Sequence, residues 1–330
     1  MTYKTARAPH LRRAERASMM CVDVLIALVP LCIFSSVYYG LRPVLLVLTG
    51  IISAIISETL CCLFMRRKPS VSDGTTAVTG ALVGALVSPL SPYWLPAAGA
   101  IFAIVAVKMP MGGSGRNLFN PAAAGMAAIT LCFQGFLFTY PDPGLGIPLP
   151  LADNALSGII TQSSPAAQLA EGGRTLYDPA ILLLGDFPGP IGATAISILL
   201  AIAVYLYIRR AVSAMIILPY LATCAVLAAV FPRASGGSWL SIMMELCSGY
   251  LLFAGVFLLN DPVTAPRHWL GRVFYGILAG LFVMLMRYFG RFEEGVCFAI
   301  LLANAFSTTL DRFGWYLLNL KRIRGRRRVA

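Results

Sequence analysis

The feature that most constrains this chain is a series of apolar segments that are long enough, or nearly long enough, to cross a lipid bilayer. A helix needs about 20 apolar residues to span the hydrocarbon core, and fewer where it is short or broken. Hydrophobic residues make up 58% of the 330 residues and charged residues 12%, whereas a soluble domain has about 25% charged residues. The sequence therefore predicts an all-α polytopic membrane protein.

We expect about ten transmembrane helices, of which the third and fourth are short. In chain order the candidate spans are Met20–Tyr38, Pro43–Met65, Thr75–Val87, Trp94–Val107, Phe119–Phe138, Ile191–Ile208, Val212–Phe231, Trp239–Leu259, Val273–Tyr288 and Gly295–Leu310.

The basic residues predict the orientation. If the N-terminus lies in the cytoplasm, ten spans return the C-terminus to the same side. Five of the 26 Lys and Arg residues then face outward, namely Arg42, Arg174, Arg233, Arg287 and Arg291. Because cytoplasmic loops carry an excess of Lys and Arg, both termini are expected in the cytoplasm. The net charge of +12 then reflects membrane topology, and nucleic-acid binding is not expected.

The spans divide the chain into two membrane halves of five spans each. The predicted parts are a cytoplasmic N-terminal segment 1–19, a first repeat 20–138, an outer loop 139–190, a second repeat 191–312 and a basic cytoplasmic tail 313–330. With five spans in each half, the second repeat is inverted relative to the first. Inverted repeats with broken helices place binding sites near the bilayer midplane, at the interface between the repeats.

One polar stretch, Met109–Ala124, interrupts the first half. Irregular backbone at membrane depth persists only where it is buried in protein or lines a site. Candidate residues for holding a phosphate or the edge of a flavin ring through this stretch are Gly112, Gly113, Arg116, Asn117 and Asn120. The alternative is close helix crossing through small residues, and spacing alone leaves both interpretations open.

Seven carboxylates lie in or beside the spans, and such groups are costly in a membrane and are functional hypotheses by default. They are Glu58, Asp73, Glu245, Asp261, Glu293, Glu294 and Asp311. Asp73 and Asp261 stand at helix breaks, which makes them candidates for an ion pathway. The alternative is that each one caps a helix start, and the two roles are compatible.

The eight cysteines form no CxxC pair, so neither an iron–sulfur nor a zinc motif is visible and no metal site is expected. Most are expected to pack as small buried apolar residues. The role of Cys21 and Cys132 stays open, because both lie near segment ends and could share a site.

Six motifs occur in order along essentially the whole chain. They are Ala8-Pro-His10, Asp23–Pro30, Ser72-Asp-Gly74, Gly112–Pro121, Asn260–Pro266 and Phe289–Ala305. On these motifs the chain resembles the D subunit of the Rnf complex, a bacterial ion-translocating ferredoxin:NAD oxidoreductase. That protein is similar in turn to the B subunit of the sodium-pumping NADH:quinone reductase.

The resemblance implies covalently bound FMN, esterified through its phosphate to a threonine in an outer-loop motif. The equivalent stretch here is Ser163–Ala166, so Ser164 is the first choice for the FMN phosphoester and Thr161 is the second. The Ser157-Gly158 pair is a further competitor. Gly192-Ala193-Thr194 lacks the acidic residue expected at its centre. The family also implies a noncovalent riboflavin, whose residues the sequence does not identify.

The implied function is electron transfer through flavins, coupled to Na+ or H+ translocation across the bacterial inner membrane. The chain shows no nicotinamide fingerprint and no iron–sulfur ligands, so it is expected to be inactive alone. The implied partners are the other proteins of an Rnf-type complex, in contact with membrane lipid: the A and E membrane proteins, the flavin-bearing G protein and the iron–sulfur B and C proteins. The alternatives are a quinone-reductase B-type protein, a flavin-free solute transporter with inverted repeats, and a structural component without its cofactor.

Overall fold

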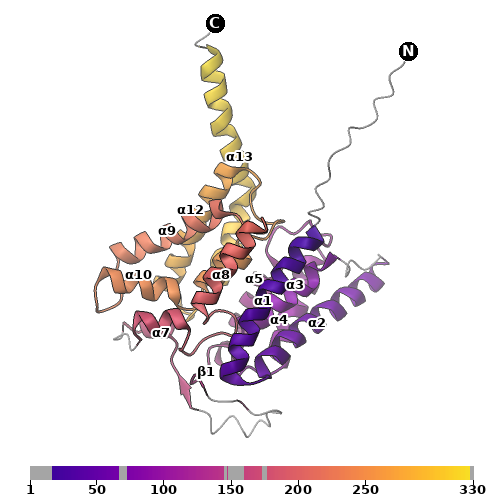
Figure 1. Ribbon diagram of the computed structural model, residues 1–330. Helices are drawn as coiled ribbons and strands as arrows, with labels where there is room; N and C mark the ends of the chain where they lie inside the picture. The colour runs from indigo at the N-terminus through magenta and orange to yellow at the C-terminus, as the bar shows by residue number, and fades with distance from the viewer. Residues whose placement is uncertain (1–16, 67–72, 145–146, 148–159, 173–176, 328–330) are drawn as a thin grey trace.

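The computed structural model describes residues 17–66, 73–144, 147, 160–172 and 177–327 (Figure 1). The predictions that concern Ala8-Pro-His10 and Ser157-Gly158 lie outside these residues. In chain order the described elements are α1 (Ala17–Tyr39), α2 (Arg42–Phe64), α3 (Thr75–Leu86), α4 (Trp94–Phe102), η2 (Ala103–Lys108), α5 (Pro121–Leu137), β1 (Tyr140–Pro141), β2 (Thr161–Gln162), α6 (Pro165–Ala170), α7 (Pro179–Leu184), α8 (Ile196–Ile208), α9 (Ala214–Val230), α10 (Ser238–Cys247), α11 (Leu251–Phe253), η4 (Ala254–Leu258), α12 (Trp269–Phe289) and α13 (Val296–Arg327).

The all-α polytopic architecture is confirmed. Four of the described helices are long and apolar enough to cross a membrane, namely α1, α2, α12 and α13. The predicted span Trp239–Leu259 is broken into α10 and the α11–η4 segment, which meet at an angle of 63°. The remaining predicted spans correspond to shorter apolar helices, so the apolar runs of the sequence identify the helices of the membrane domain.

The start of the sixth predicted span is wrong by five residues. Helix α8 begins at Ile196 rather than Ile191, because the backbone before it bonds to another part of the core rather than within a helix. The residues from Phe187 to Ala195 are instead buried without forming a helix. Their backbone finds partners in the core, since the N–H groups of Ile191 and Gly192 donate to the carbonyl oxygens of Val87 (3.1 Å) and Ala85 (2.6 Å).

The two halves share one local feature that the sequence did not predict. Helix α4 continues into the π-helical segment η2, and α11 continues into the π-helical segment η4. Each segment ends in the same wide turn, with Met109 N–H donating to Ile104 O and Leu259 N–H donating to Ala254 O, both at 2.9 Å. Each then leads directly into a polar motif. Such π-helical turns occur frequently at functional sites.

Small residues let several helix pairs approach closely. A methyl group added at Gly80 of α3 would lie 2.8 Å from Ile51 Cα of α2, and one at Gly84 would lie 2.6 Å from Val47 Cα. Gly125 of α5 packs in the same way on Gly99 of α4. This is the packing expected in lipid, where close backbone contact stabilises helix association.

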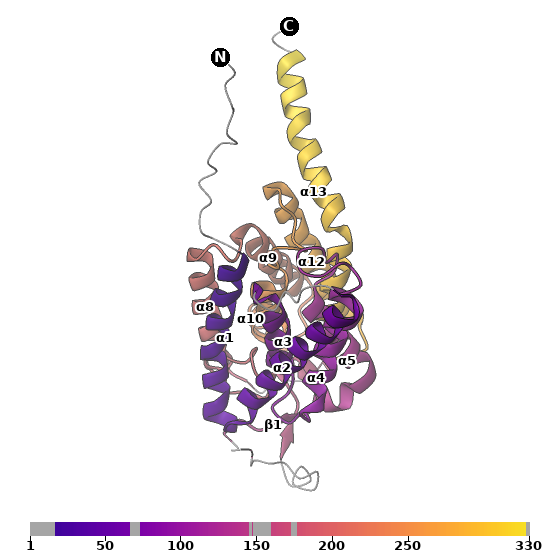
Figure 2. The same ribbon diagram turned by 90° about the vertical axis from the view of Figure 1, so that its right-hand side faces the viewer.

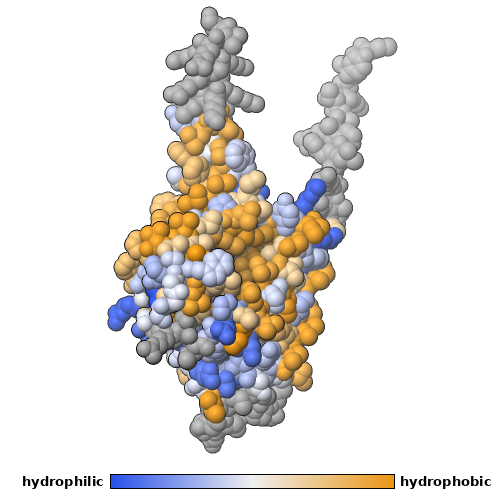
Figure 3. Space-filling model, turned by 60° about the vertical axis from the view of Figure 1, so that its left-hand side comes forward, coloured by the Kyte–Doolittle hydropathy of each residue, from blue (hydrophilic) through white to orange (hydrophobic). Residues whose placement is uncertain are grey.

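The N-terminal end of α1 and the C-terminal end of α13 lie on one side of the helix bundle, and β1 lies on the opposite side (Figures 1 and 2). We call these the terminal side and the hairpin side. Strands β1 and β2 pair antiparallel, with Tyr140 opposite Gln162. Apolar residues cover much of the bundle between the two sides, and hydrophilic residues gather toward its ends (Figure 3). Strand β1, which belongs to the predicted outer loop, thus lies on the side opposite to the start of α1 and the end of α13.

Candidate functional site

A cavity of about 640 Å³ opens between the two halves of the chain on the terminal side. Its walls come from the start of α1, from α3, from the polar stretch after η2, and from η4 with the motif that follows it. The polar residues of the lining are Ser18, Asp73, Thr75, Thr79, Lys108, Ser114, Asn117, Asn120, Asn260 and Asp261. The fold thus brings four of the predicted site residues, Asp73, Asn117, Asn120 and Asp261, to one place.

Asn120 joins the two halves. Its Oδ1 accepts hydrogen bonds from the N–H groups of Ala122 (2.9 Å) and Ala123 (3.2 Å), which caps α5, and its Nδ2 donates to Leu258 O in η4 (2.8 Å). Asn117 differs, because its buried Oδ1 has no hydrogen-bond partner among the described residues. A buried amide oxygen without a partner is unusual, and Asn117 therefore has capacity left for a ligand in the cavity.

The glycines of the polar stretch shape the loop. Gly112, Gly113 and Gly115 have φ angles of +108°, +89° and +84°, a region that favours glycine. The N–H groups of Gly112 and Gly113 donate to Met109 O (3.1 Å) and Lys108 O (3.0 Å), inside the loop. Of the three glycines, Gly115 lines the cavity. Arg116 is exposed and lies outside the lining, so the geometry favours Asn117 and Asn120 as ligand contacts.

Asp73 and Asp261 both line the cavity but make different contacts. Asp73 is exposed, and α3 begins after Gly74 without a side-chain cap, so the capping interpretation of Asp73 is wrong. The Asp261 carboxylate accepts from Val263 N–H (3.3 Å) and Thr264 Oγ1 (3.2 Å), and it therefore stabilises the turn in which it stands. Their role in an ion pathway stays a prediction.

Lys108 is one of the basic residues that the predicted topology places on the cytoplasmic side, and its side chain is buried. Its side chain is 1% exposed, and Nζ lies 3.1 Å from Glu58 Oε2. Nζ also donates to the hydroxyl oxygens of Thr75 (2.9 Å) and Thr76 (2.5 Å). The three donors of the ammonium group therefore all have partners. Sequence reasoning missed this contact because the two partners of the ion pair are 50 positions apart. Glu58 lies inside helix α2, whereas Lys108 is the last residue of η2.

On the hairpin side, Ser164 is the N-cap of α6 and its Oγ accepts a hydrogen bond from Ala167 N–H (3.1 Å). Its hydroxyl also donates to the Glu293 carboxylate, and the residue is 4% exposed. Glu293 belongs to the connection between α12 and α13. Burial raises the pKa of Glu293 to about 8, and the Ser164 hydrogen bond opposes this shift. Thr161, in β2, is exposed, so the two candidate anchors for FMN differ sharply in accessibility.

A sequence comparison identifies the family. The family model described as NQR2, RnfD, RnfE matches residues 4–314. The chain belongs to the NQR2, RnfD, RnfE family. It is 28% identical over 328 residues to the D subunit of the ion-translocating oxidoreductase complex of Halorhodospira halophila, with 92% of each chain covered. It is also 28% identical over 312 residues to the D subunit of the proton-translocating ferredoxin:NAD(+) oxidoreductase complex of Clostridium ljungdahlii, with 94% of each covered.

A third relative, the D subunit of the ion-translocating oxidoreductase complex of Cronobacter sakazakii, is 29% identical over 345 residues, covering 95% of this chain and 97% of its own. The resemblance inferred from the six motifs is therefore confirmed at the level of the family.

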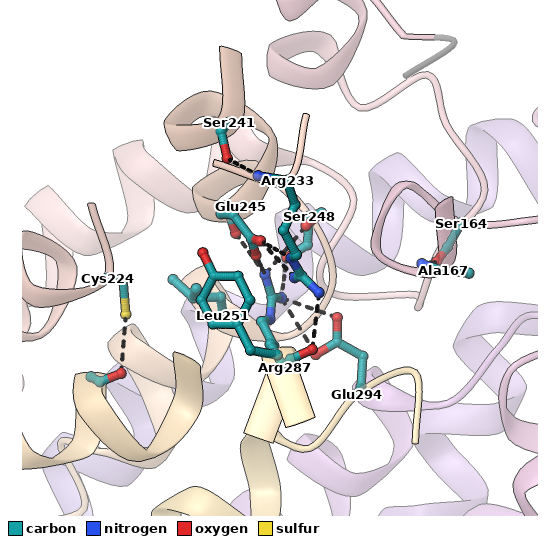
Figure 4. A network of polar contacts seen from close by, with 12 residues as sticks. Ser164, Ala167, Cys224, Arg233, Ser241, Glu245, Ser248, Leu251, Arg287 and Glu294 are labelled. Atoms are coloured by element: carbon teal, nitrogen blue, oxygen red, sulfur yellow. Dashed lines mark hydrogen bonds and ion pairs between the residues drawn. The ribbon is translucent and has the colours of Figure 1, made fainter. Parts of the chain in front are cut away.

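This member of the NQR2, RnfD, RnfE family also carries a network of four charged residues near Ser164 (Figure 4). Arg287 lies 3.0 Å from Glu245 Oε2 and 3.0 Å from Glu294 Oε1, and Arg233 Nε donates to Glu245 Oε1 (2.8 Å). Glu245 and Glu294 are buried, and Arg287 also donates to Ser248 O (2.7 Å). The carboxylates are neutralised by the two arginines, so we interpret this charge network as structural.

The possibility that Cys21 and Cys132 share a site is wrong in this family member. Cys21 lines the cavity on the terminal side. Cys132 is exposed near the end of α5, whose chain leads into β1 on the hairpin side. Among the described residues, no group of three or more His, Cys, Asp or Glu is arranged to hold a metal ion.

Proposed function

We propose that this chain is the D-type membrane protein of an Rnf-type ion-translocating oxidoreductase, which carries electrons through covalently bound FMN and couples them to Na+ or H+ movement. The observation that carries the proposal is the meeting of Asp73, Asn117, Asn120 and Asp261, from both halves of the chain, at one cavity. The relatives named as D subunits of such complexes match the chain over 92% or more of its length, which favours the Rnf type over the quinone-reductase type.

The surroundings of Ser164 are compatible with a phosphoester. A phosphate on Oγ would stand at the start of α6, where Ala167 N–H already points at the oxygen, and N–H groups at helix starts favour anions. Glu293, whose pKa is raised to about 8, is mostly protonated at neutral pH. It can then donate a hydrogen bond to a phosphate oxygen rather than repel it. FMN would supply the redox chemistry, while the protein supplies position and electrostatics.

The cavity on the terminal side suits a cation. Its lining holds two carboxylates, Asp73 and Asp261, and the one basic residue of the described lining, Lys108, is already paired with Glu58. We assign these two carboxylates to the ion pathway. A noncovalent riboflavin belongs to the same proposal, and Asn117 and Asn120 are the polar groups best placed to contact its ring.

The proposal includes the assembly and the location. The partners are the A and E membrane proteins, the flavin-bearing G protein and the iron–sulfur B and C proteins of an Rnf-type complex, in the bacterial inner membrane with both termini in the cytoplasm. The location of the start of α1 and the end of α13 on one side of the bundle is compatible with this topology.

The test is the ultraviolet fluorescence of the denatured protein on a gel, with peptide mass mapping of residues 151–174. The protein is produced together with its native flavin transferase, as wild type, Ser164→Ala and Thr161→Ala. Fluorescence that is lost with Ser164→Ala and kept with Thr161→Ala establishes Ser164 as the anchor. The reverse pattern moves the anchor to Thr161. A wild-type protein without fluorescence contradicts the covalent flavin and favours the transporter or structural alternatives.

A further inference from the structure

A second pocket, of about 580 Å³, adjoins the cavity on the terminal side. It lies between the end of α8, the start of α9 and the segment that precedes α12. Its charged lining residues are Arg210, Arg267 and Arg272, and the described lining contains no Asp or Glu. We call it the arginine pocket. A cavity that gathers three guanidinium groups without an acid differs from the neighbouring cavity, whose lining is acidic.

The arginines of this pocket form no ion pair within the described part of the chain. None of the five ion pairs found among the described residues includes Arg210, Arg267 or Arg272. The adjacent Arg209 is paired with Asp23 at 3.0 Å. Arg272 Nε donates to Pro266 O (3.0 Å), which is a neutral acceptor. Like charges held close together at a membrane surface repel one another, and a bound anion would remove this repulsion.

One helix start adds to the positive potential. Helix α9 has 17 residues, begins at Ala214 in the pocket wall, and has neither a side-chain cap nor an acidic residue in its first turn. A helix start favours an anion, so α9 lacks the negative charge that this position favours. The start of α12 differs, because the Asp311 carboxylate accepts a hydrogen bond from His268 N–H there (2.7 Å).

The excess of basic residues on cytoplasmic loops explains which side these arginines occupy. It does not explain why three of them surround one hollow. The same hollow has an apolar wall that includes Tyr207, Ile208 and Met215, which are 57%, 71% and 50% exposed. A pocket with basic and apolar walls at the end of the membrane helices suits a phosphate group that is attached to an apolar body.

We propose that the arginine pocket binds a phosphate group, supplied by an anionic phospholipid or by a soluble phosphate compound, through Arg210, Arg267, Arg272 and the start of α9. This site is separate from the predicted FMN anchor and from Asp73. It shares Asn260 and Pro262 with the acidic cavity, so an occupied arginine pocket would hold one wall of that cavity in place.

The test uses the full chain purified in a neutral detergent. Binding of phosphatidylglycerol is measured by native mass spectrometry, with phosphatidylcholine as the uncharged comparison and inorganic phosphate as competitor. The variants are Arg210→Gln with Arg272→Gln, and Arg272→Lys. The matched control is Arg66→Gln, because Arg66 is also exposed and has a positive φ of 53°, close to the 60° of Arg210, yet lies outside the pocket.

We expect the double variant to bind phosphatidylglycerol at least about tenfold more weakly, since two charge-assisted contacts are lost. Arg66→Gln should bind like wild type, and Arg272→Lys should lie between them because it keeps the charge. Competition by inorganic phosphate at millimolar concentration identifies a site for soluble phosphate, and its absence identifies a lipid headgroup site. A double variant that melts at the wild-type temperature and binds phosphatidylglycerol as wild type does overturns the proposal, as does an equal loss with Arg66→Gln.

Discussion

The acidic cavity on the terminal side and the charge network on the hairpin side both contain polar residues within the helix bundle. The network pairs its charges, whereas the cavity leaves hydrogen-bonding groups unused. In the charge network, Arg233 and Arg287 form ion pairs with Glu245 and Glu294 at 2.5 to 3.0 Å. A Cβ at Gly249 would overlap the Glu294 carboxylate, so no space is left there. In the cavity, Asn117 Oδ1 has no partner among the described residues and Asp73 is exposed.

The difference shows how to interpret polar groups in a membrane domain. Such groups are expensive wherever they occur, so their presence alone does not separate structure from function. Pairing of every charge with an opposite charge indicates that a group stabilises the fold, and the charge network meets this condition although Arg287 Nε has no hydrogen-bond partner among the described residues. Unused hydrogen-bonding capacity beside a hollow indicates a group that is available to a ligand. By this criterion the charge network stabilises the fold, and the cavity is the place to look for chemistry.

The largest expected effect on stability is that of Arg287→Met, which breaks the charge network. It leaves Glu294 buried without its cation and leaves Glu245 with Arg233 alone. Removing one partner of a buried ion pair costs about 3–5 kcal/mol. Thermal unfolding of the purified protein should show a clear drop in midpoint. The matched control is Arg291→Met, at an exposed position on the same side. Equal midpoints for the two variants would show that the network does not stabilise the fold.

The next effect depends on pH and is expected at Glu293, which lies between the charge network and Ser164. Its pKa is about 8 in the folded protein, against an ordinary value of 4.5. Between these two pKa values the Glu293 carboxyl is deprotonated in the unfolded chain and protonated in the folded protein. Its contribution to the free energy of unfolding therefore falls as pH rises from about 5 to 8, by at most about 1.4 kcal/mol per pH unit.

Glu293→Gln should therefore make the decline of the unfolding midpoint between pH 5 and pH 8 shallower than in wild type. Glu171→Gln, at an exposed position of the outer loop, is the control and should follow wild type. A Glu293→Gln variant with the wild-type pH dependence would show that this carboxyl titrates normally.

The smallest effect on stability is expected for Asp73→Asn with Asp261→Asn, since an amide oxygen can still accept the hydrogen bonds of Asp261. The loss should be about 1 kcal/mol or less. Redox-driven ion uptake into membrane vesicles that contain the whole complex should nevertheless fall strongly. Asp178→Asn, at the exposed start of α7, is the control. Uptake at the wild-type ratio of ions to electrons would remove Asp73 and Asp261 from the ion pathway.

The sequence predicts the helices well because an apolar run reports directly on burial in lipid. The sequence does not predict the burial of Lys108. Its charge at the end of an apolar run indicates a loop, whereas in the structure it forms an ion pair with Glu58 of another helix. The sequence also fails to predict the buried, non-helical residues before α8. The glycines at 112, 113 and 115 predict an irregular loop. No local signal shows that Asn120 reaches Leu258, or that Glu293 covers Ser164, because these contacts join distant parts of the chain.

The close contact between α2 and α3 has a mechanical consequence. Because Gly80 and Gly84 leave no room for even a methyl group against α2, α2 and α3 pack backbone to backbone, and we expect them to move together. Any rearrangement that changes access to the cavity is therefore directed to the seam between the halves. That seam is crossed by the Asn120–Leu258 hydrogen bond, by the Asp23–Arg209 ion pair and by the backbone bonds from Ile191 and Gly192 to Val87 and Ala85, so we expect a change of access to break several of these contacts together.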